Sequence, residues 1–374
     1  MRIWLCLVAA VLVSGCGRSA DVPGPAGPDT PINQGWRFLR EDGPAAAVDR
    51  ADPRAQPGFD DSTWETVTLP HTVRVEPPTH GPAYFKGVCW YRRRVPLSPA
   101  WRGRRVAVAF DGAMQATDVY VNGRHVRTHL GGYLPFVVDL TPAAATPGPI
   151  LLALRLDNRA NPAFPPGSDH IDFAYYGGLY RPARLLVTDP VHITDPIAAN
   201  RVAGGGVFVR DENVSAASAD LLVQVNVRND SAEAADVAVE HRLIGPDDRP
   251  AATVDSPVSR VAAGGDVDLI SRLTVPDPKL WHPDHPDLYR LVTIVKRNGV
   301  ACGQQETRCG IRHLAYTNAG FFINGEKLVL RGANRHMSFP WIGNAGSDNL
   351  QYRDIRLLKE AGFNFVRLAH YPQS

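Results

Sequence analysis

Outside its N-terminus, the 374-residue sequence lacks any apolar run near the ~20 residues that a membrane-spanning helix needs. It also lacks an excess of charge of one sign, since 40 Lys and Arg residues face 38 Asp and Glu residues. This balance does not fit the strongly basic class of nucleic-acid-binding proteins, so we expect no nucleic-acid partner. Hydrophobic residues make up 44% of the chain, which is too many for a disordered protein.

The N-terminus has the pattern of an export signal. Residues 3–13 form an apolar run that is too short to span a bilayer and follows the basic Arg2. Ser14 and Gly15 precede Cys16 and resemble the lipobox of bacterial lipoproteins, where the signal is cut before a cysteine that then carries lipid. We therefore predict a signal peptide over residues 1–15, lipidation at Cys16 and a flexible tether over residues 16–31. The alternative is a plain secretory signal with an incidental cysteine.

On this interpretation the protein is an exported bacterial lipoprotein, either periplasmic or at the outer membrane or cell surface, and the membrane is a partner through the lipid anchor. Cys6 would be removed with the signal peptide and Cys16 would carry lipid, which leaves Cys89, Cys302 and Cys309. Three cysteines are a poor basis for a disulfide framework. Cys302 and Cys309 fall on one predicted extended segment, about 23 Å apart at ~3.3 Å per residue, which is beyond disulfide reach. We expect all three to be free structural thiols.

Glycine and proline are abundant, with 33 and 32 residues, and imply many turns and few long helices. Short strand-like runs recur from about residue 60 to residue 310, and residues 221–227 alternate apolar and polar side chains as a half-buried strand does. Asn-Gly pairs at residues 122–123, 298–299 and 324–325 predict hairpins with type I′ turns. The pattern indicates antiparallel β-sandwiches.

A break near Asp189-Pro190 divides this β region into a first sandwich over residues 32–188 and a second over residues 189–311. Seven short strands predict an immunoglobulin-like fold for the second. They lie near residues 191–194, 207–210, 221–228, 235–243, 266–274, 288–296 and 300–308.

From residue 312 the pattern changes to strand, loop, helix and strand. A hairpin arm over residues 328–332 runs into a glycine, a helix follows over residues 349–361, and an apolar strand covers residues 363–368. Asp348 is the predicted N-cap and Gly362 the residue after the C-cap, with Ile355 and Leu358 on the inner face. This order is a βαβ unit, so a parallel α/β domain begins here and continues to residue 374.

Short motifs recur in order from residue 33 onward. They include Gly35-Trp36-Arg37-Phe38, Trp90-Tyr91-Arg92-Arg93, Phe110-Asp111-Gly112, Gly131-Gly132-Tyr133, Tyr176-Gly177-Gly178-Leu179-Tyr180-Arg181-Pro182, Leu280-Trp281-His282-Pro283, Arg331-Gly332-Ala333-Asn334-Arg335-His336 and Val366-Arg367-Leu368-Ala369-His370-Tyr371-Pro372. Each is weak alone, but the ordered set resembles glycoside hydrolase family 2, the group of β-galactosidases, β-glucuronidases and β-mannosidases.

The resemblance implies a multi-domain, mainly β chain: a jelly-roll β-sandwich, an immunoglobulin-like β-sandwich and the first βαβ of a (β/α)8 barrel. It implies a retaining exo-β-glycosidase of carbohydrate metabolism that hydrolyses terminal β-linked sugars, most like a β-galactosidase, with a β-glucuronidase or β-mannosidase as the alternative. The substrate is then a β-glycoside or oligosaccharide. No cofactor is implied for this chain, although full-length members can hold Mg²⁺ or Na⁺, and a homo-oligomer is left open.

Retention of configuration needs two carboxylates about 5–5.5 Å apart, and in this family they are Glu residues that follow barrel strands 4 and 7. The acids between residues 311 and 374 are Glu326, Asp348, Asp354 and Glu360, none of them at the predicted C-terminal end of a barrel strand. We therefore expect the catalytic Glu pair to be absent from this chain, which would be part of a longer enzyme and inactive alone. The competing interpretation is a non-catalytic carbohydrate-binding or scaffold lipoprotein.

Substrate-binding residues carry over by resemblance. His336 and His370 end the first two barrel strands and would contact the sugar, while Asn334 and Arg335 would shape the loop that follows the first of these strands. Arg367 would orient a catalytic carboxylate. The alternatives are a loop fixed by internal hydrogen bonds for His336 and a buried structural ion pair for Arg367.

Asp172 would reach from the jelly roll into the barrel mouth and hydrogen-bond sugar hydroxyls. Its alternative is a turn-capping role, and the nearby Asp169 could be confused with it. His125 and His129 fall on a predicted hairpin rather than a helix, so no zinc pair follows and we expect no metal site in this chain.

Overall fold

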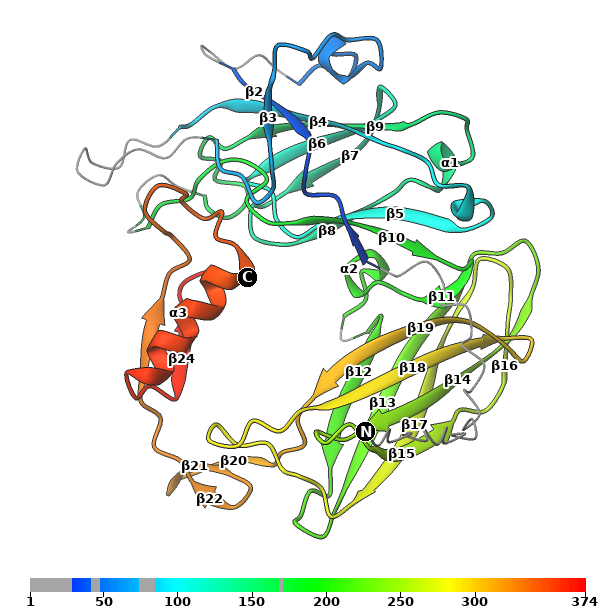
Figure 1. Ribbon diagram of the computed structural model, residues 1–374, viewed down its shortest axis with the longest axis vertical. Coiled ribbons are helices and arrows are strands. Elements are labelled where there is room, and N and C mark those ends of the chain that lie inside the picture. The colour runs from blue at the N-terminus through cyan, green and yellow to red at the C-terminus, as the bar shows by residue number, and fades with distance from the viewer. Residues whose placement is uncertain (1–28, 42–47, 74–84, 168–170, 172, 203) are drawn as a thin grey trace, which may run out of the picture.

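The chain folds into two β-sandwiches and a smaller α/β unit (Figure 1). The structure, a computed structural model, describes residues 29–41, 48–73, 85–167, 171, 173–202 and 204–374. The predicted signal peptide, Cys16 and most of the tether lie outside these residues. Within them, no helix has the length and apolar character needed to cross a membrane.

The first sandwich packs a six-stranded antiparallel sheet on a four-stranded one. The larger sheet has the order β3 (Glu65–Val67), β2 (Trp36–Arg40), β4 (Val88–Val95), β9 (Ile150–Asp157), β6 (Ala116–Val121) and β7 (Arg124–Leu130). The smaller has the order β1 (Asp29–Pro31), β10 (Ala183–Thr188), β5 (Arg105–Phe110) and β8 (Phe136–Asp139). The connections hold the short helices η1 (Pro53–Ala55), η3 (Pro99–Trp101) and α1 (Thr141–Ala144).

The core of this sandwich lies between the two sheets. Trp36 of β2 is fully buried, donates a hydrogen bond from Nε1 to the carbonyl of Ile32 at 2.6 Å, and meets Phe110 of β5 edge-on at 6.2 Å. Phe110 in turn stacks on Phe136 of β8 at 5.0 Å. Aromatic rings from both sheets therefore fill the interior, and the predicted jelly-roll sandwich is confirmed.

The second sandwich has β13 (Ser218–Asn229) at the centre of one sheet, between β17 (Asp266–Pro276) on one edge and both β11 (Val191–Ile193) and β12 (Val207–Glu212) on the other. Its other sheet has the order β15 (Pro250–Asp255), β14 (Ala235–Ile244), β18 (Tyr289–Arg297) and β19 (Val300–Cys309), with β16 (Ser259–Val261) also on β14. The short helix α2 (Pro196–Ala199) joins β11 to β12.

The immunoglobulin-like prediction for this region is confirmed, but β15 and β16 were not predicted. Both are short and pair only with β14, and β15 shows no clear alternation of buried and exposed side chains. An edge strand of this kind leaves little periodic signal in a sequence.

The three Asn-Gly pairs behave as predicted. Both residues have positive φ in each pair, for example 50° and 84° at Asn122 and Gly123, which is the requirement of a type I′ turn. The pairs join β6 to β7, β18 to β19, and β21 to β22. Cys89, Cys302 and Cys309 are unpaired, and the latter two lie on the single strand β19, as expected.

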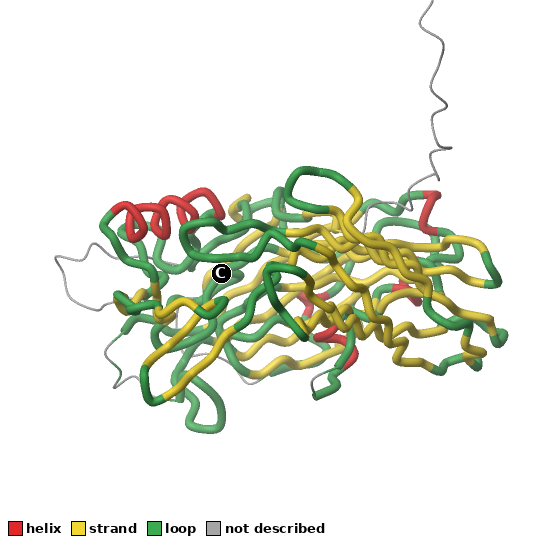
Figure 2. Tube along the Cα trace, turned by 90° about the horizontal axis from the view of Figure 1, so that it is seen from below, coloured by secondary structure: helices red, strands yellow, loops and turns green. Residues whose placement is uncertain are grey.

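The α/β unit starts with a small antiparallel sheet of β20 (Leu314–Thr317), β21 (Gly320–Ile323) and β22 (Glu326–Lys327). Then β23 (Gly332–Arg335) pairs in parallel with β24 (Phe365–Leu368), and the helix α3 (Asp348–Glu360) connects them. The βαβ prediction is confirmed. Figure 2 shows α3 at one end of the molecule, away from the bulk of the strands.

Two details of this unit were predicted wrongly. The first barrel strand does not run into Gly332 but begins there, and residues 328–331 form a connection in which Val329 is 59% and Leu330 42% exposed. Pairing with β24 determines where β23 begins, because residues 365–368 of β24 pair only with residues 332–335. Asn334 and Arg335 therefore lie on the strand rather than in the loop after it.

The helix boundaries also differ. Ser347, not Asp348, occupies the N-cap, and Asp348 is the first helical residue. Of the predicted inner-face pair, Ile355 is 41% exposed and Leu358 is half-buried, while the most buried helix residue is Gln351. Two strands are too narrow a surface to cover the apolar face of this helix. Gly362, with φ +87°, follows the helix end as predicted.

Candidate functional site

An aromatic cluster joins the first sandwich to the α/β unit. Its buried members are Met114, Tyr133, Tyr175 and Tyr180 from the sandwich and Met337 and Tyr371 from the α/β unit. Tyr133 and Tyr371 stack with ring centroids 4.9 Å apart and 14° between planes. Arg181 completes the junction by donating hydrogen bonds to the carbonyls of Tyr133 at 3.0 Å and Pro372 at 2.5 Å. The cluster thus fixes the C-terminal ends of β23 and β24 against the sandwich.

Two of the predicted site residues meet at this junction. His336 follows β23 and His370 follows β24, and because the strands are parallel their C-terminal ends lie side by side. The imidazole rings are 5.3 Å apart and nearly perpendicular. Phe173 of the first sandwich lies 5.7 Å from His336 and 6.0 Å from His370. The site is therefore built by the first sandwich and the α/β unit, whose contributing residues are more than 150 positions apart in the chain.

His336 has an unused polar atom. Its Nδ1 is buried and has no hydrogen-bond partner in the part of the chain that the structure describes. A buried imidazole nitrogen without a partner is costly, and a ligand hydroxyl could satisfy it. The alternative prediction, a loop held only by its own hydrogen bonds, does not account for this atom.

Arg367 and Asn334 extend the site on the same face. The Arg367 Nη1 donates to Asn334 Oδ1 at 3.3 Å and lies 3.1 Å from His370 Nδ1. Since a guanidinium only donates, the His370 Nδ1 accepts this bond and the ring proton is on Nε2. The Arg367 side chain is exposed and forms no ion pair with a described carboxylate.

Arg335 turns to the opposite side of β23. Its guanidinium is buried and forms an ion pair with Asp354 of α3, a hydrogen bond to Gln351, and a 2.8 Å hydrogen bond to Gln373 Oε1. Gln373 also donates to the carbonyl of Ala369 at 3.0 Å. These contacts support a role in holding α3 and the chain after β24 in place, and they do not support a direct sugar contact by this residue.

The loop after β23 docks on the first sandwich. Thr72 Oγ1 donates to the carbonyl of Ile342 at 3.1 Å, and the Tyr176 ring covers Gly343, where an added Cβ would lie 2.7 Å from a ring carbon. Burial raises the pKa of Tyr176, with a further contribution from Tyr371. Trp341, 68% exposed, is at the tip of this loop. The loop is therefore held on one side and open at its tip.

The carboxylates of the α/β unit form no hydrogen bond or ion pair with His336 or His370 in the part of the chain that the structure describes. Glu326 is on β22, Asp354 pairs with Arg335, and Glu360 pairs with Arg356 at 3.3 Å along α3. No group of three or more His, Cys, Asp or Glu side chains among the described residues could hold a metal ion. Asp172 and Asp169 lie outside the described residues, so the structure does not place them.

Sequence reasoning missed Phe173 and the Tyr133–Tyr371 stack. Tyr133 and Tyr371 stand in two of the quoted motifs, but no local pattern indicates that the motifs touch. Phe173 stands only two residues before Tyr175-Tyr176-Gly177, and its aromatic character was the single available signal.

Models of one protein family match three successive parts of the chain. Residues 32–189 match the sugar binding domain of glycosyl hydrolases family 2, residues 205–312 match the model named for the family itself, and residues 314–374 match its TIM barrel domain.

Curated and solved relatives agree with these matches. A β-galactosidase of Thermoanaerobacter pseudethanolicus is 31% identical over 84% of this chain and 41% of its own length. A β-glucuronidase of Formosa agariphila is 29% identical over 92% of this chain and 36% of its own length. The structure of Bacteroides uniformis β-glucuronidase 2, covalently bound to cyclophellitol-6-carboxylate aziridine, aligns with a TM-score of 0.81 at 30% identity, over 92% of this chain and 40% of that one. The chain thus spans roughly two fifths of the length of these relatives.

Proposed function

Because the chain belongs to glycosyl hydrolases family 2, we propose that it forms part of a retaining exo-β-glycosidase that hydrolyses terminal β-linked sugars, with β-galactosides preferred. The substrate is a β-glycoside or oligosaccharide, and the reaction belongs to carbohydrate metabolism. The relative named β-galactosidase supports the sugar preference.

One observation carries the proposal, namely the meeting of His336 and His370 at the C-terminal ends of two parallel strands, beside Phe173. Catalytic and binding residues of TIM barrels gather at this end of the strands. Imidazole nitrogens and the Arg367 guanidinium offer hydrogen bonds to sugar hydroxyls, and an aromatic ring packs on a sugar face. These residues would bind and orient the sugar.

The proposed retaining mechanism requires a nucleophile and an acid/base carboxylate about 5–5.5 Å apart. The acids of β22 and α3 form no hydrogen bond or ion pair with the histidine pair, so in this proposal the two Glu residues come from coding sequence beyond codon 374. Reading that sequence tests the point. The proposal expects a Glu after an Asn near the end of a fourth barrel strand and a second Glu near the end of a seventh.

The activity test uses the complete gene product and p-nitrophenyl β-galactoside, β-glucuronide and β-mannoside. We expect hydrolysis of the galactoside with the highest kcat/KM. His336→Gln and His370→Gln should each lower kcat/KM on the order of 100-fold without loss of folding, because they remove hydrogen bonds to the reacting sugar. His313→Gln is the matched control, since His313 is an exposed histidine of the same unit.

A β-glucuronidase is the second candidate, and the named β-glucuronidases among the relatives and structures favour it. A higher kcat/KM on the glucuronide would establish it over the galactosidase. Failure to cleave any of the three substrates, together with retained sugar binding, would instead support a non-catalytic carbohydrate-binding or scaffold protein.

The proposed location is the periplasm, outer membrane or cell surface, with a lipid on Cys16. The apolar run before Ser14-Gly15-Cys16 supports it. Radiolabelled palmitate should enter the wild-type protein and not a Cys16→Ser variant, which should also leave the membrane fraction. A homo-oligomer is a further part of the proposal, and light scattering of the purified protein without its N-terminal signal tests it.

A further inference from the structure

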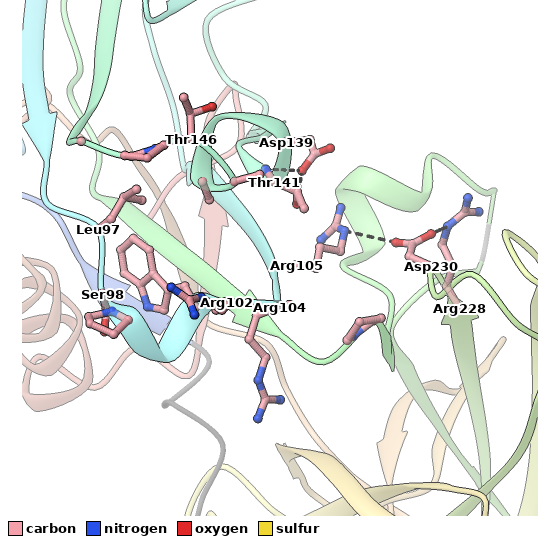
Figure 3. A pocket seen from close by; sticks show the side chains of 18 residues that line it. Leu97, Ser98, Arg102, Arg104, Arg105, Asp139, Thr141, Thr146, Arg228 and Asp230 are labelled. Atoms are coloured by element: carbon pink, nitrogen blue, oxygen red, sulfur yellow. Dashed lines mark hydrogen bonds and ion pairs between the residues drawn. The ribbon is translucent and has the colours of Figure 1, made fainter.

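A cavity of about 970 Å³ lies between the two sandwiches. The first sandwich contributes η3 with the turn after it, and the chain around α1, while the second contributes Pro190 and two residues near the end of β13 (Figure 3). Figure 1 places α1 on the opposite side of the first sandwich from α3. The histidine pair and its neighbours are not among the residues that line this cavity.

Positive charge dominates the lining. Two carboxylates, Asp139 and Asp230, face four arginines, namely Arg102, Arg104, Arg105 and Arg228. Asp230 contacts two of these arginines. Arg105 Nε lies 3.4 Å from its Oδ2, and Arg228 Nε donates to its Oδ1 at 2.6 Å (Figure 3). Both contacts use Nε, and the terminal Nη groups of these arginines have no hydrogen bond to a described residue.

The other charges do not remove this excess. Asp139 is held by its own turn, where Oδ1 accepts from the Thr141 amide at 2.9 Å and from the Thr141 hydroxyl at 2.6 Å. Arg104 lies 3.4 Å from Asp189 outside the lining. Arg102 is exposed and has no ion-pair partner among the described carboxylates. Guanidinium donors therefore outnumber the acceptors that the protein supplies.

The remaining lining suits a sugar. Trp101 is half-buried, packs on the core of the first sandwich and lines the cavity, so it offers a fixed aromatic surface. Ser98 and Thr146 add hydroxyl groups. Guanidinium groups bind carboxylate and sulfate oxygens with paired, charge-assisted hydrogen bonds. An aromatic surface beside arginines that keep unused guanidinium donors matches a sugar that carries negative charge.

We propose that this cavity binds an acidic oligosaccharide, one with uronate carboxylates or sulfate esters. Arg102, Arg105 and Arg228 hold the charged groups. Trp101 packs against a sugar ring. Through this site the protein would bind an acidic polysaccharide away from the terminal sugar that the proposed enzyme removes. Binding in this cavity does not depend on hydrolysis.

Calorimetric titration of the folded protein tests this directly with three tetrasaccharides: tetragalacturonate, a chondroitin sulfate tetrasaccharide and neutral cellotetraose. At least one acidic probe should bind ten or more times more tightly than cellotetraose, and added salt should weaken it. The tighter of the two acids identifies the type of charge that the arginines recognise. Equal affinity for tetragalacturonate, the sulfated probe and cellotetraose would overturn the proposal.

The variant Arg102→Gln/Arg228→Gln should lose about tenfold or more in affinity for the acidic probe, because two charge-assisted contacts disappear. Asp230 keeps Arg105 as its partner in this variant. The matched control is Arg249→Gln/Arg308→Gln, which removes the same charge from two exposed arginines of the second sandwich. Wild-type affinity in the first variant, or an equal loss in the control, contradicts a site in this cavity. Tighter binding of a short single-stranded DNA at the same arginines would also overturn the sugar assignment.

Discussion

Tyr371 stacks on Tyr133 with ring centroids 4.9 Å apart and 14° between the ring planes. Tyr371 comes just after β24, and Tyr133 comes from the loop before β8 of the first sandwich. This contact helps to hold the ends of two parallel strands beside Phe173, which lies 5.1 Å from Tyr371. The geometry of the candidate site therefore depends on the first sandwich as much as on the barrel strands.

Replacing Tyr371 with Ala should loosen this junction. The change removes a buried aromatic ring from its stack and should cost about 3 kcal/mol, because large-to-small substitution leaves a cavity as well as losing contacts. Amide hydrogen exchange at residues 336–343 should accelerate on the order of 100-fold. Tyr352→Ala, at a side chain of α3 that is 74% exposed, is the control and should leave this exchange unchanged. Equal exchange in the wild type and Tyr371→Ala would show that the stack is not what holds the site.

Substitution of Gly343 tests whether contact with the Tyr176 ring holds the loop after β23 in place. A Cβ at this position meets the Tyr176 ring at 2.7 Å, and φ is +56°. Gly343→Ala should therefore release the loop and speed proteolytic cleavage near Trp341. Gly325→Ala also places a side chain at positive φ, but its Cβ meets nothing within 4 Å. If both variants behave alike, backbone strain rather than the ring contact accounts for the effect.

The buried Arg335 and the exposed Arg356 offer a matched pair of ion-pair deletions. Arg335→Ala leaves Asp354 and Gln351 without their partner and should destabilise the packing of α3 by about 3 kcal/mol. Arg356→Ala removes an exposed pair with Glu360 on the same helix and should cost at most about 0.5 kcal/mol. Hydrogen exchange of α3 amides measures both. A similar, small effect of the two changes would contradict the structural role assigned to Arg335.

The second sandwich should lose stability in acid through His241. This side chain is fully buried on β14, its Nδ1 lies 3.0 Å from Thr293 Oγ1, and burial lowers its pKa from 6.5 to about 4. Between pH 6.5 and pH 4 the unfolded chain binds a proton that the folded chain does not, so stability is full above pH 6.5 and falls as the pH drops to about 4. The loss is about 3 kcal/mol.

Urea unfolding at pH 7 and pH 4.5 measures this dependence. His241→Leu should flatten it, because the variant has no proton to gain at this position. His313→Leu, at an exposed histidine, should keep the wild-type dependence. An unchanged dependence in His241→Leu would show that other groups cause the acid sensitivity.

Local patterns predicted much of the fold because their physical causes are local. The Asn-Gly turns are one case, since Asn324 and Gly325 have the positive φ values that only a few residue types accept. Gly362 at the end of α3 is another. The strand β23 was misplaced because Leu328, Val329 and Leu330 look like a strand, while the pairing with β24 places it at residues 332–335.

The candidate site was less accessible from the sequence. His336 and His370 could be named from their motifs, but the contact of both with Phe173 arises from the packing of one domain on another. Arg335 shows the limit of such motifs, because it stands between Asn334 and His336 yet faces the opposite side of the strand. Successive side chains of a strand point to opposite faces, so residues that are adjacent in a motif can lie on different sides of the sheet.

The anomeric configuration of the first product tests the central claim most directly. The complete gene product should be given p-nitrophenyl β-galactoside, or the β-glucuronide if that is cleaved faster, and followed by proton NMR from the first turnovers. A retaining β-glycosidase releases the β-anomer first, and the α-anomer appears only later by mutarotation. Initial release of the α-anomer, or no cleavage of either substrate, would contradict the proposed function.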